Sequence, residues 1–429
     1  MGMEKYRNKT DISILTKIFS IYVVLLPITQ YYKSPLTMFN LATFMAIVFL
    51  FVFITKLNNN MQLDKRSFPI KIYISFITIN VIFASIINNT SFSNLNILNY
   101  LRAMLLIITI LIVGKNYFDR GYALKALETI LLLSSAFMVI QLICIFILHH
   151  PISGNIGFLV TKSSYAIGKN RPSGFYMEPA AYAQSAMIYL AFSLFRNKEW
   201  SNAEKYKTIW IALGIIFSGS GQGYAFLALI LFIWMLYNMF FRALTKQSFF
   251  KGILLIILLI IGIMIILKTQ YGQYVLSRII NDENSDGLAT LGGKALSGRT
   301  YTNKRFYELT NIQQLFGVGF GRSNVVIGDY YVNSLYYYLI ECGYISIAVW
   351  LIMGLLTFRK GNLCVKVFLL IYTIMFYFSG CGRPMMVCFN FMFLLYDNYC
   401  SNNYSLGNDR KDKELNNEEN CNGNSSPNS

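Results

Sequence analysis

The chain has 429 residues, of which 55% are apolar and only 13% are charged. An ordinary soluble protein carries about 25% charged residues, so this composition excludes a soluble globular domain and indicates a protein that lies in lipid. The 37 basic residues against 20 acidic ones give a net charge of +17, but in a membrane protein Lys and Arg chiefly set orientation, so nucleic acid is not expected as a partner.

Apolar runs long enough to cross a bilayer recur along almost the whole chain. They predict an all-α, polytopic integral membrane protein with about twelve transmembrane helices. The predicted spans are 12–30, 36–56, 68–88, 98–114, 122–148, 179–196, 207–219, 222–241, 251–268, 331–357, 363–380 and 384–400. Residues 1–400 then form one membrane domain, and the polar residues 401–429 are predicted to be a disordered cytoplasmic tail.

One pair of spans needs a turn between its members. Residues 207–241 are too many for one straight span and few for two. The segment Ser218-Gly219-Ser220-Gly221 is therefore expected to turn a short helix back on itself. With that turn the number of spans is even, which puts both termini in the cytoplasm.

Basic residues are distributed unevenly between the predicted loops. The positive-inside rule places Lys and Arg in cytoplasmic loops. Of the 37 basic residues, 24 fall in the termini and the alternate loops assigned to the cytoplasm, among them 115–125 and 196–207. The other 13 lie outside, mainly in the loops 149–178 and 269–330, and 7 of them are arginines. Arg pairs with phosphate oxygens in a bidentate manner, so these outer loops are the expected place for a phosphate.

The first outer loop enters the sixth predicted helix through the segment Arg171–Pro179, which reads RPSGFYMEP. Its prolines and its glycine fix the backbone path, and a proline suits the first turn of a helix. Arg171 and Glu178 are therefore expected to be held near the membrane surface. Two interpretations of Glu178 stand: the carboxylate can cap the helix by interacting with the free amides there, or it can be catalytic.

The second outer loop contains Ser297-Gly298-Arg299 and, further on, the glycine-rich segment Phe316–Arg322. Loops of about 60 residues are usually functional or disordered. The glycines of the second segment allow backbone amides to approach an anion closely, as in a phosphate-binding turn.

The tenth predicted span carries an acid, Glu341, within its apolar run. A carboxylate at that depth is costly and is expected to face a partner or a watery cavity. Three tyrosines, 336–338, precede it and form either an interfacial aromatic belt or a platform on which sugars stack. Asp329 is a further, weaker acidic candidate.

In this order, these segments resemble the Wzy-type O-antigen and capsular polysaccharide polymerases, a family that shares its membrane architecture with the O-antigen ligases. The resemblance covers most of the chain. It uses the segments Arg171–Pro179, Ser218-Gly219-Ser220-Gly221, Ser297-Gly298-Arg299 and Gly317-Val318-Gly319, together with Asn333, Glu341 and Gly343. Ligases of the family carry a histidine directly before this asparagine, where the chain has Val332, and this difference favours a polymerase over a ligase.

The resemblance implies a metal-independent glycosyltransferase that joins oligosaccharide repeat units linked to undecaprenyl pyrophosphate, which serve as both donor and acceptor. The reaction takes place at the outer face of the bacterial cytoplasmic membrane and requires no cofactor, because the activated bond is already present in the lipid pyrophosphate. A protein that regulates chain length is a further expected partner. The implied catalytic residues are Glu178, Glu341 and Arg171, the pyrophosphate-binding residues are Arg171, Arg299 and Arg322, and the sugar-binding residues are Tyr176 and Asn333.

A function of another class is a flippase that moves lipid-linked sugars across the bilayer. Such transporters usually contain paired repeats and helices that are broken at mid-membrane depth. The two halves of this sequence show no convincing repeat, and the outer charges gather at one face. That distribution favours a reaction at the surface over alternating access.

Overall fold

The described part of the chain is helical. The computed structural model describes residues 13–35, 39–55, 67–88, 94–156, 159, 172–196, 200–241, 305–328 and 333–396. In these ranges the extended pairing is one isolated bridge between Lys33 and Asn40. Four helical runs found there are long and apolar enough to cross a membrane: Phe68–Ile87, Ile97–Tyr117, Arg120–Phe146 and Gly221–Asn238. The all-α class is confirmed, and these helices indicate a membrane-embedded protein, while the total of twelve spans stays a prediction.

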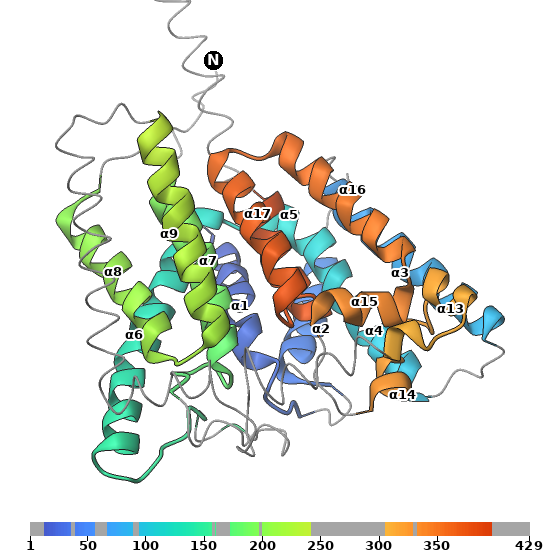
Figure 1. Cartoon of the computed structure of the whole chain (residues 1–429), viewed down its shortest axis with the longest axis horizontal. Helices are drawn as coiled ribbons and strands as arrows, with labels where there is room; N and C mark the ends of the chain where they lie inside the picture. Colours follow the sequence, from blue (N-terminus) through green and yellow to red (C-terminus); the bar gives the residue numbers. More distant parts are fainter. Residues whose placement is uncertain are drawn as a thin grey trace, which may run out of the picture.

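Most helices begin and end close to the predicted spans, and Figure 1 shows how they are arranged. Their bounds are α1 Ile14–Thr29, α2 Leu41–Ile54, α3 Phe68–Ile87, α4 Asn94–Thr109, the π-helix η2 Ile110–Gly114, α5 Lys115–Tyr117, α6 Arg120–Phe146, α7 Pro179–Leu194, α8 Asn202–Phe217, α9 Gly221–Phe241, α13 Asn311–Phe316, α14 Ser323–Ile327, α15 Ser334–Cys342, α16 Ile345–Lys360, α17 Leu363–Phe378 and α18 Pro384–Leu395. The predicted turn at residues 218–221 is confirmed, because α8 ends just before it and α9 begins at Gly221. The predicted span 251–268 and the tail 401–429 lie outside the described residues.

The prediction of one continuous span over 331–357 is wrong. The chain forms two helices there, α15 and α16, which are separated at Gly343 with φ +67°. A helix commonly ends at a glycine in this left-handed conformation, and the Gly343 amide closes α15 by donating to the Leu339 carbonyl at 2.9 Å. With nine residues, α15 is too short to cross a bilayer, and it lies across the directions of α16 and α17 (Figure 1).

Aromatic side chains hold α15 against its two neighbours. The ring of Tyr338 on α15 lies 5.4 Å from that of Trp350 on α16 and 5.5 Å from that of Phe376 on α17, and the last two rings are 4.5 Å apart. The Tyr338 hydroxyl also donates to the Gly382 carbonyl at 2.7 Å. Aromatic side chains contribute large contact areas and prefer edge-on or offset-stacked arrangements, so these contacts hold α15 in place although it is short.

One end of the bundle gathers the end of α1, the segment after α6 and the start of α18. Gln30 donates through its amide to the Met386 sulfur at 3.9 Å, and the Ile156 amide donates to the Tyr32 hydroxyl at 3.0 Å. The Ser334 amide at the start of α15 donates to the Ser379 carbonyl at 2.8 Å, which brings α15 to the same place. We call this the Glu341 end.

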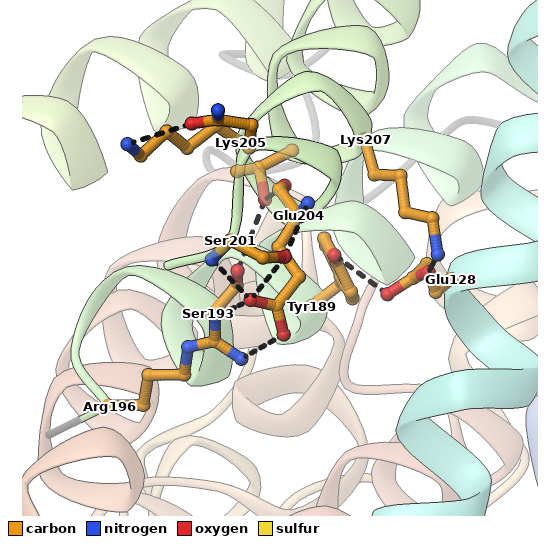
Figure 2. Close-up of polar contacts among 10 residues, drawn as sticks. Glu128, Tyr189, Ser193, Arg196, Ser201, Glu204, Lys205 and Lys207 are labelled. Carbon is orange, nitrogen blue, oxygen red and sulfur yellow. Dashed lines mark hydrogen bonds and ion pairs between the residues drawn. The ribbon is translucent and has the colours of Figure 1, made fainter. Parts of the chain in front are cut away.

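The opposite end, which we call the Arg120 end, carries the starts of α6 and α8 and the end of α7. The Arg120 guanidinium lies over the Phe192 ring, 4.9 Å from its centroid. Lys207 on α8 forms an ion pair of 2.6 Å with Glu128 on α6 (Figure 2). Two of the basic segments that were predicted to share a side of the membrane, 115–125 and 196–207, therefore lie at the same end.

A capping box fixes the start of α8 at this end (Figure 2). The Ser201 hydroxyl accepts from the Glu204 amide, and the Glu204 carboxylate accepts from the Ser201 amide at 2.9 Å. Arg196 pairs with the same carboxylate at 2.7 Å. The Arg196 guanidinium, followed by the Ser201 amide and hydroxyl, holds the pKa of Glu204 well below its ordinary value of 4.5.

Candidate functional site

The glycine-rich segment lies directly against the C-terminal end of α15. The Val318 amide donates to the Ile340 carbonyl and the Gly319 amide donates to the Glu341 carbonyl, both at 2.9 Å. Gly317 has φ +82°, and a Cβ atom there would collide with the Glu341 backbone, so glycine is required. These two amides therefore bind the last carbonyls of α15, and they are not available to cradle a phosphate as the sequence predicted.

Glu341 is fully buried beneath this segment. Its Oε1 atom accepts a hydrogen bond of 3.2 Å from the Ser323 amide, and its buried Oε2 atom has no hydrogen-bond partner among the described residues. Burial raises the pKa of Glu341 to about 7, against the opposing effect of the Gly321 and Ser323 groups. A buried acid with one oxygen left unsatisfied is uncommon in a structural role, and it is suited to taking a proton near neutral pH.

A cavity of about 60 Å³ is lined by Ser323, whose amide donates to this carboxyl group, and Glu341 itself is not part of the lining. The lining also includes Ser334, Tyr337 and Arg383. Tyr337 lies within electrostatic reach of both Glu341 and Arg383. A space of this size holds about two water molecules or a group such as a hydroxyl. The cavity thus combines a cation with hydroxyl groups around a small polar space, and the buried acid contacts one of its lining residues, Ser323.

Arg383 was not selected by the sequence analysis as a site residue. It precedes α18 at its N-cap position, and its side chain is exposed at the cavity. A signal for it exists, because Arg383-Pro384 repeats at the start of α18 the arginine-proline pair of Arg171-Pro172. Pro384 is the first residue of α18, so Arg383 stands just outside that helix.

Three of the predicted site residues lie around α15. Arg322 directly precedes Ser323, and its side chain packs against Gly319, where a Cβ atom would lie 3.2 Å from the arginine Cδ. Asn333 caps α15, accepting from the Tyr336 amide at 2.9 Å. Arg322 therefore lies next to Ser323, the residue that donates to Glu341, whereas Asn333 and Glu341 stand at opposite ends of α15. The phosphate-binding and sugar-binding roles stay predictions.

The segment before α7 has the rigid backbone that the sequence predicted. The Gln141 side-chain oxygen accepts from the Ser173 and Gly174 amides at 3.0 and 2.9 Å. Glu178 is the N-cap residue of α7 and is half-buried, yet its side chain forms no capping hydrogen bond. The simple interpretation of Glu178 as a side-chain cap is therefore wrong.

Tyr176 is fully buried and does not line an open surface. Its ring packs edge-on against Tyr182 with 5.5 Å between centroids, and its hydroxyl has no hydrogen-bond partner within the described ranges. This is the position of a packing residue, and the role in sugar binding stays a prediction.

Arg171, Arg299, Asp329 and Val332 lie outside the described residues. In the part of the chain that the structure describes, no group of three or more His, Cys, Asp and Glu side chains is placed to hold a metal ion. Comparison with known protein families, with curated proteins and with solved structures finds no match to this chain.

Proposed function

We propose that the chain is a membrane glycosyltransferase that polymerises oligosaccharide repeat units carried on undecaprenyl pyrophosphate. The reaction takes place at the Glu341 end, which in this proposal faces the outside of the bacterial cytoplasmic membrane. The resemblance to the Wzy-type polymerases and the outer-loop arginines support this assignment.

In the proposed reaction, a hydroxyl group of the acceptor repeat attacks the anomeric carbon of the donor sugar. A new glycosidic bond forms, and the bond between that carbon and the pyrophosphate oxygen breaks. The hydroxyl proton passes to a carboxylate, for which Glu341 is the first candidate and Glu178 the second. Undecaprenyl pyrophosphate leaves, and Arg383, Arg322 and the predicted Arg171 and Arg299 stabilise its charge.

The observation that carries the proposal is the buried Glu341 carboxyl, whose Oε2 atom has no hydrogen-bond partner in the described structure. It accepts from the Ser323 amide, and Ser323 lines a cavity together with Tyr337 and Arg383. A base for a hydroxyl and a cation for a leaving phosphate are the two groups that transfer from a lipid pyrophosphate requires.

The orientation is supported by the distribution of charge. The predicted cytoplasmic segments 115–125 and 196–207 meet at the Arg120 end, and Arg383 lies at the other end. Thiol-labelling of single cysteines placed at Arg171 and Arg299 in intact cells tests it: both positions should react from the outside. Labelling from opposite sides would remove the proposed site.

The direct test of the function supplies purified undecaprenyl-pyrophosphate-linked repeat units to the purified chain in lipid vesicles. A ladder of products that differ by one repeat supports a polymerase. A single product linked to lipid A, when that acceptor is added, identifies a ligase instead. Movement of the repeat unit across the vesicle membrane with no new glycosidic bond identifies a flippase.

A further inference from the structure

Asn80 is a buried polar side chain inside α3, a helix that is long and apolar enough to cross a membrane. It lies about two helical turns before Asn88, the residue at which that helix ends. An amide group in an apolar span is costly unless it is hydrogen-bonded, and polar residues in such places often have a role in function. The proposed reaction, as described above, does not use Asn80.

The Asn80 side chain binds the glycine-rich segment at two points. Its Nδ2 atom donates to the Phe316 carbonyl at 2.8 Å, and its Oδ1 atom accepts from the Phe320 amide at 3.1 Å. Between these points, the Val318 and Gly319 amides donate to carbonyls of α15. The segment is therefore held on one side by α3 and on the other by α15.

Asn80 also reaches the end of α15 itself. The buried Cys342 thiol, which directly follows the acid of α15, donates to the same Oδ1 atom at 3.5 Å. One oxygen thus accepts from the glycine-rich segment and from α15, which fixes the two relative to each other. Beyond this point the Arg322 amide donates to the Gly319 carbonyl at 3.2 Å, and the resulting turn leads directly to Ser323.

A second asparagine within a helix shows a different arrangement. Asn390 on α18 is also buried, but its side-chain amide donates to the Met386 carbonyl of its own helix at 2.6 Å. The bonds of Asn80 instead join three segments of the chain around one carboxyl group. We infer that Asn80 is a positioning residue, which sets the glycine-rich segment on α15 so that the Ser323 amide meets Glu341. Its importance for catalysis rests on the proposed function, whereas the placement of the amide does not.

The first test follows the Glu341 carboxyl group without any substrate. Infrared spectra of the full chain in a non-ionic detergent are recorded against pH, and the band of the protonated acid is identified by its absence in Glu341→Gln. Asn80→Leu keeps a similar volume but removes the hydrogen-bonding groups, so the Ser323 amide should move away from the acid. Because a hydrogen bond to a carboxylate favours its charged form, the titration midpoint should rise by about one pH unit.

Asn390→Leu is the matched control, and it should leave this midpoint unchanged. The titratable groups that the structure places within reach of the acid are the same in both variants: Tyr73 on α3, and Tyr337 and Cys342 on α15. If thermal unfolding shows that Asn80→Leu does not fold, Asn80→Ala takes its place, because it cannot overpack the core and should give the same shift. An unchanged midpoint in the folded variant would overturn the inference.

The second test measures catalysis. With purified lipid-linked repeat units, the pH at which the rate rises should move upward in Asn80→Leu by as much as the infrared midpoint does. A lower rate at every pH without this movement would show that Asn80 has a structural role only, and would overturn its role as a positioning residue. If the unmodified chain makes no polymer, the proposed function fails, and the infrared midpoint still decides whether Asn80 places the Ser323 amide.

Discussion

The Ser323 amide donates a 3.2 Å hydrogen bond to the buried carboxyl group of Glu341, 18 residues further along the chain. This bond joins the glycine-rich segment to the end of α15, and it orients one oxygen of the acid while the other has no hydrogen-bond partner in the described structure. The candidate site therefore depends on an accurate fit between a loop and a short helix.

Two glycines test that fit. Gly317 and Gly328 both have positive φ, +82° and +61°, so alanine is strained at either position. Only at Gly317 would the new Cβ atom collide with the Glu341 backbone, whereas nothing lies within 4 Å of it at Gly328. Gly317→Ala should abolish polymerisation, and Gly328→Ala should retain most of it at a cost of about 1–2 kcal/mol in stability. Equal polymerisation rates in the two variants would contradict the close contact between Gly317 and the Glu341 backbone.

Arg383 is expected to stabilise the leaving pyrophosphate. Arg383→Ala should lower the rate of polymer formation roughly a hundredfold, the usual effect of removing one group that stabilises developing charge. Arg383→Lys should recover part of it, because the charge returns without the bidentate geometry. Arg359→Gln, at the Arg120 end, is the control and should leave the rate unchanged. A normal rate in Arg383→Ala would remove Arg383 from the site.

The two outer-loop arginines of the sequence prediction give a separate expectation. Arg171→Ala and Arg299→Ala should each abolish polymer while the protein is still found in the membrane at its normal level. Immunoblots of membrane fractions measure the amount of protein, and gel analysis of extracted polysaccharide measures the product. An unchanged polymer ladder in both variants would count against a guanidinium-lined pyrophosphate site.

The rate should depend on pH near neutrality. A general base acts without its proton, so the rate should rise with pH through about 7, the pKa to which burial raises Glu341. Glu178→Gln decides between the two acids: the same rising limb in this variant identifies Glu341 as the base. A rate that is constant between about pH 6 and 8 in the unmodified enzyme would contradict the assignment.

The start of α8 offers a stability prediction that is independent of function. Ser201→Ala removes the hydroxyl of the capping box and should lower the free energy of unfolding by about 1 kcal/mol. Ser85→Ala is the comparison, because that hydroxyl donates to the Val81 carbonyl of its own helix and caps nothing. Thermal unfolding in detergent should show the larger decrease for Ser201→Ala.

The sequence was a reliable guide where apolar runs end at polar or turn-forming residues. The bounds of α6 and α17 and the turn at residues 218–221 follow from such local signals. The break at Gly343 was missed because the residues on both sides are apolar, and the helix ends there through backbone geometry and a contact with residue 315. Hydropathy contains no information on such contacts.

The candidate site was predictable only in part. Glu341 was identified because an acid is anomalous in an apolar run. Its hydrogen bond to Ser323 and the place of Arg383 in the cavity that Ser323 lines were not, since these relationships join segments far apart along the chain and depend on how α15 and α18 pack. The amides of residues 318 and 319 were wrongly assigned to an anion for the same reason: their real acceptors are carbonyls of α15.

The most direct test of the account changes the Glu341 carboxyl group alone. Glu341→Gln preserves the size of the side chain and an oxygen that accepts from the Ser323 amide, but it removes the base. With purified lipid-linked repeat units, the account predicts a rate of glycosidic-bond formation at least a hundredfold lower than in the unmodified chain, at equal thermal stability. A polymer ladder formed by Glu341→Gln at the normal rate would contradict it.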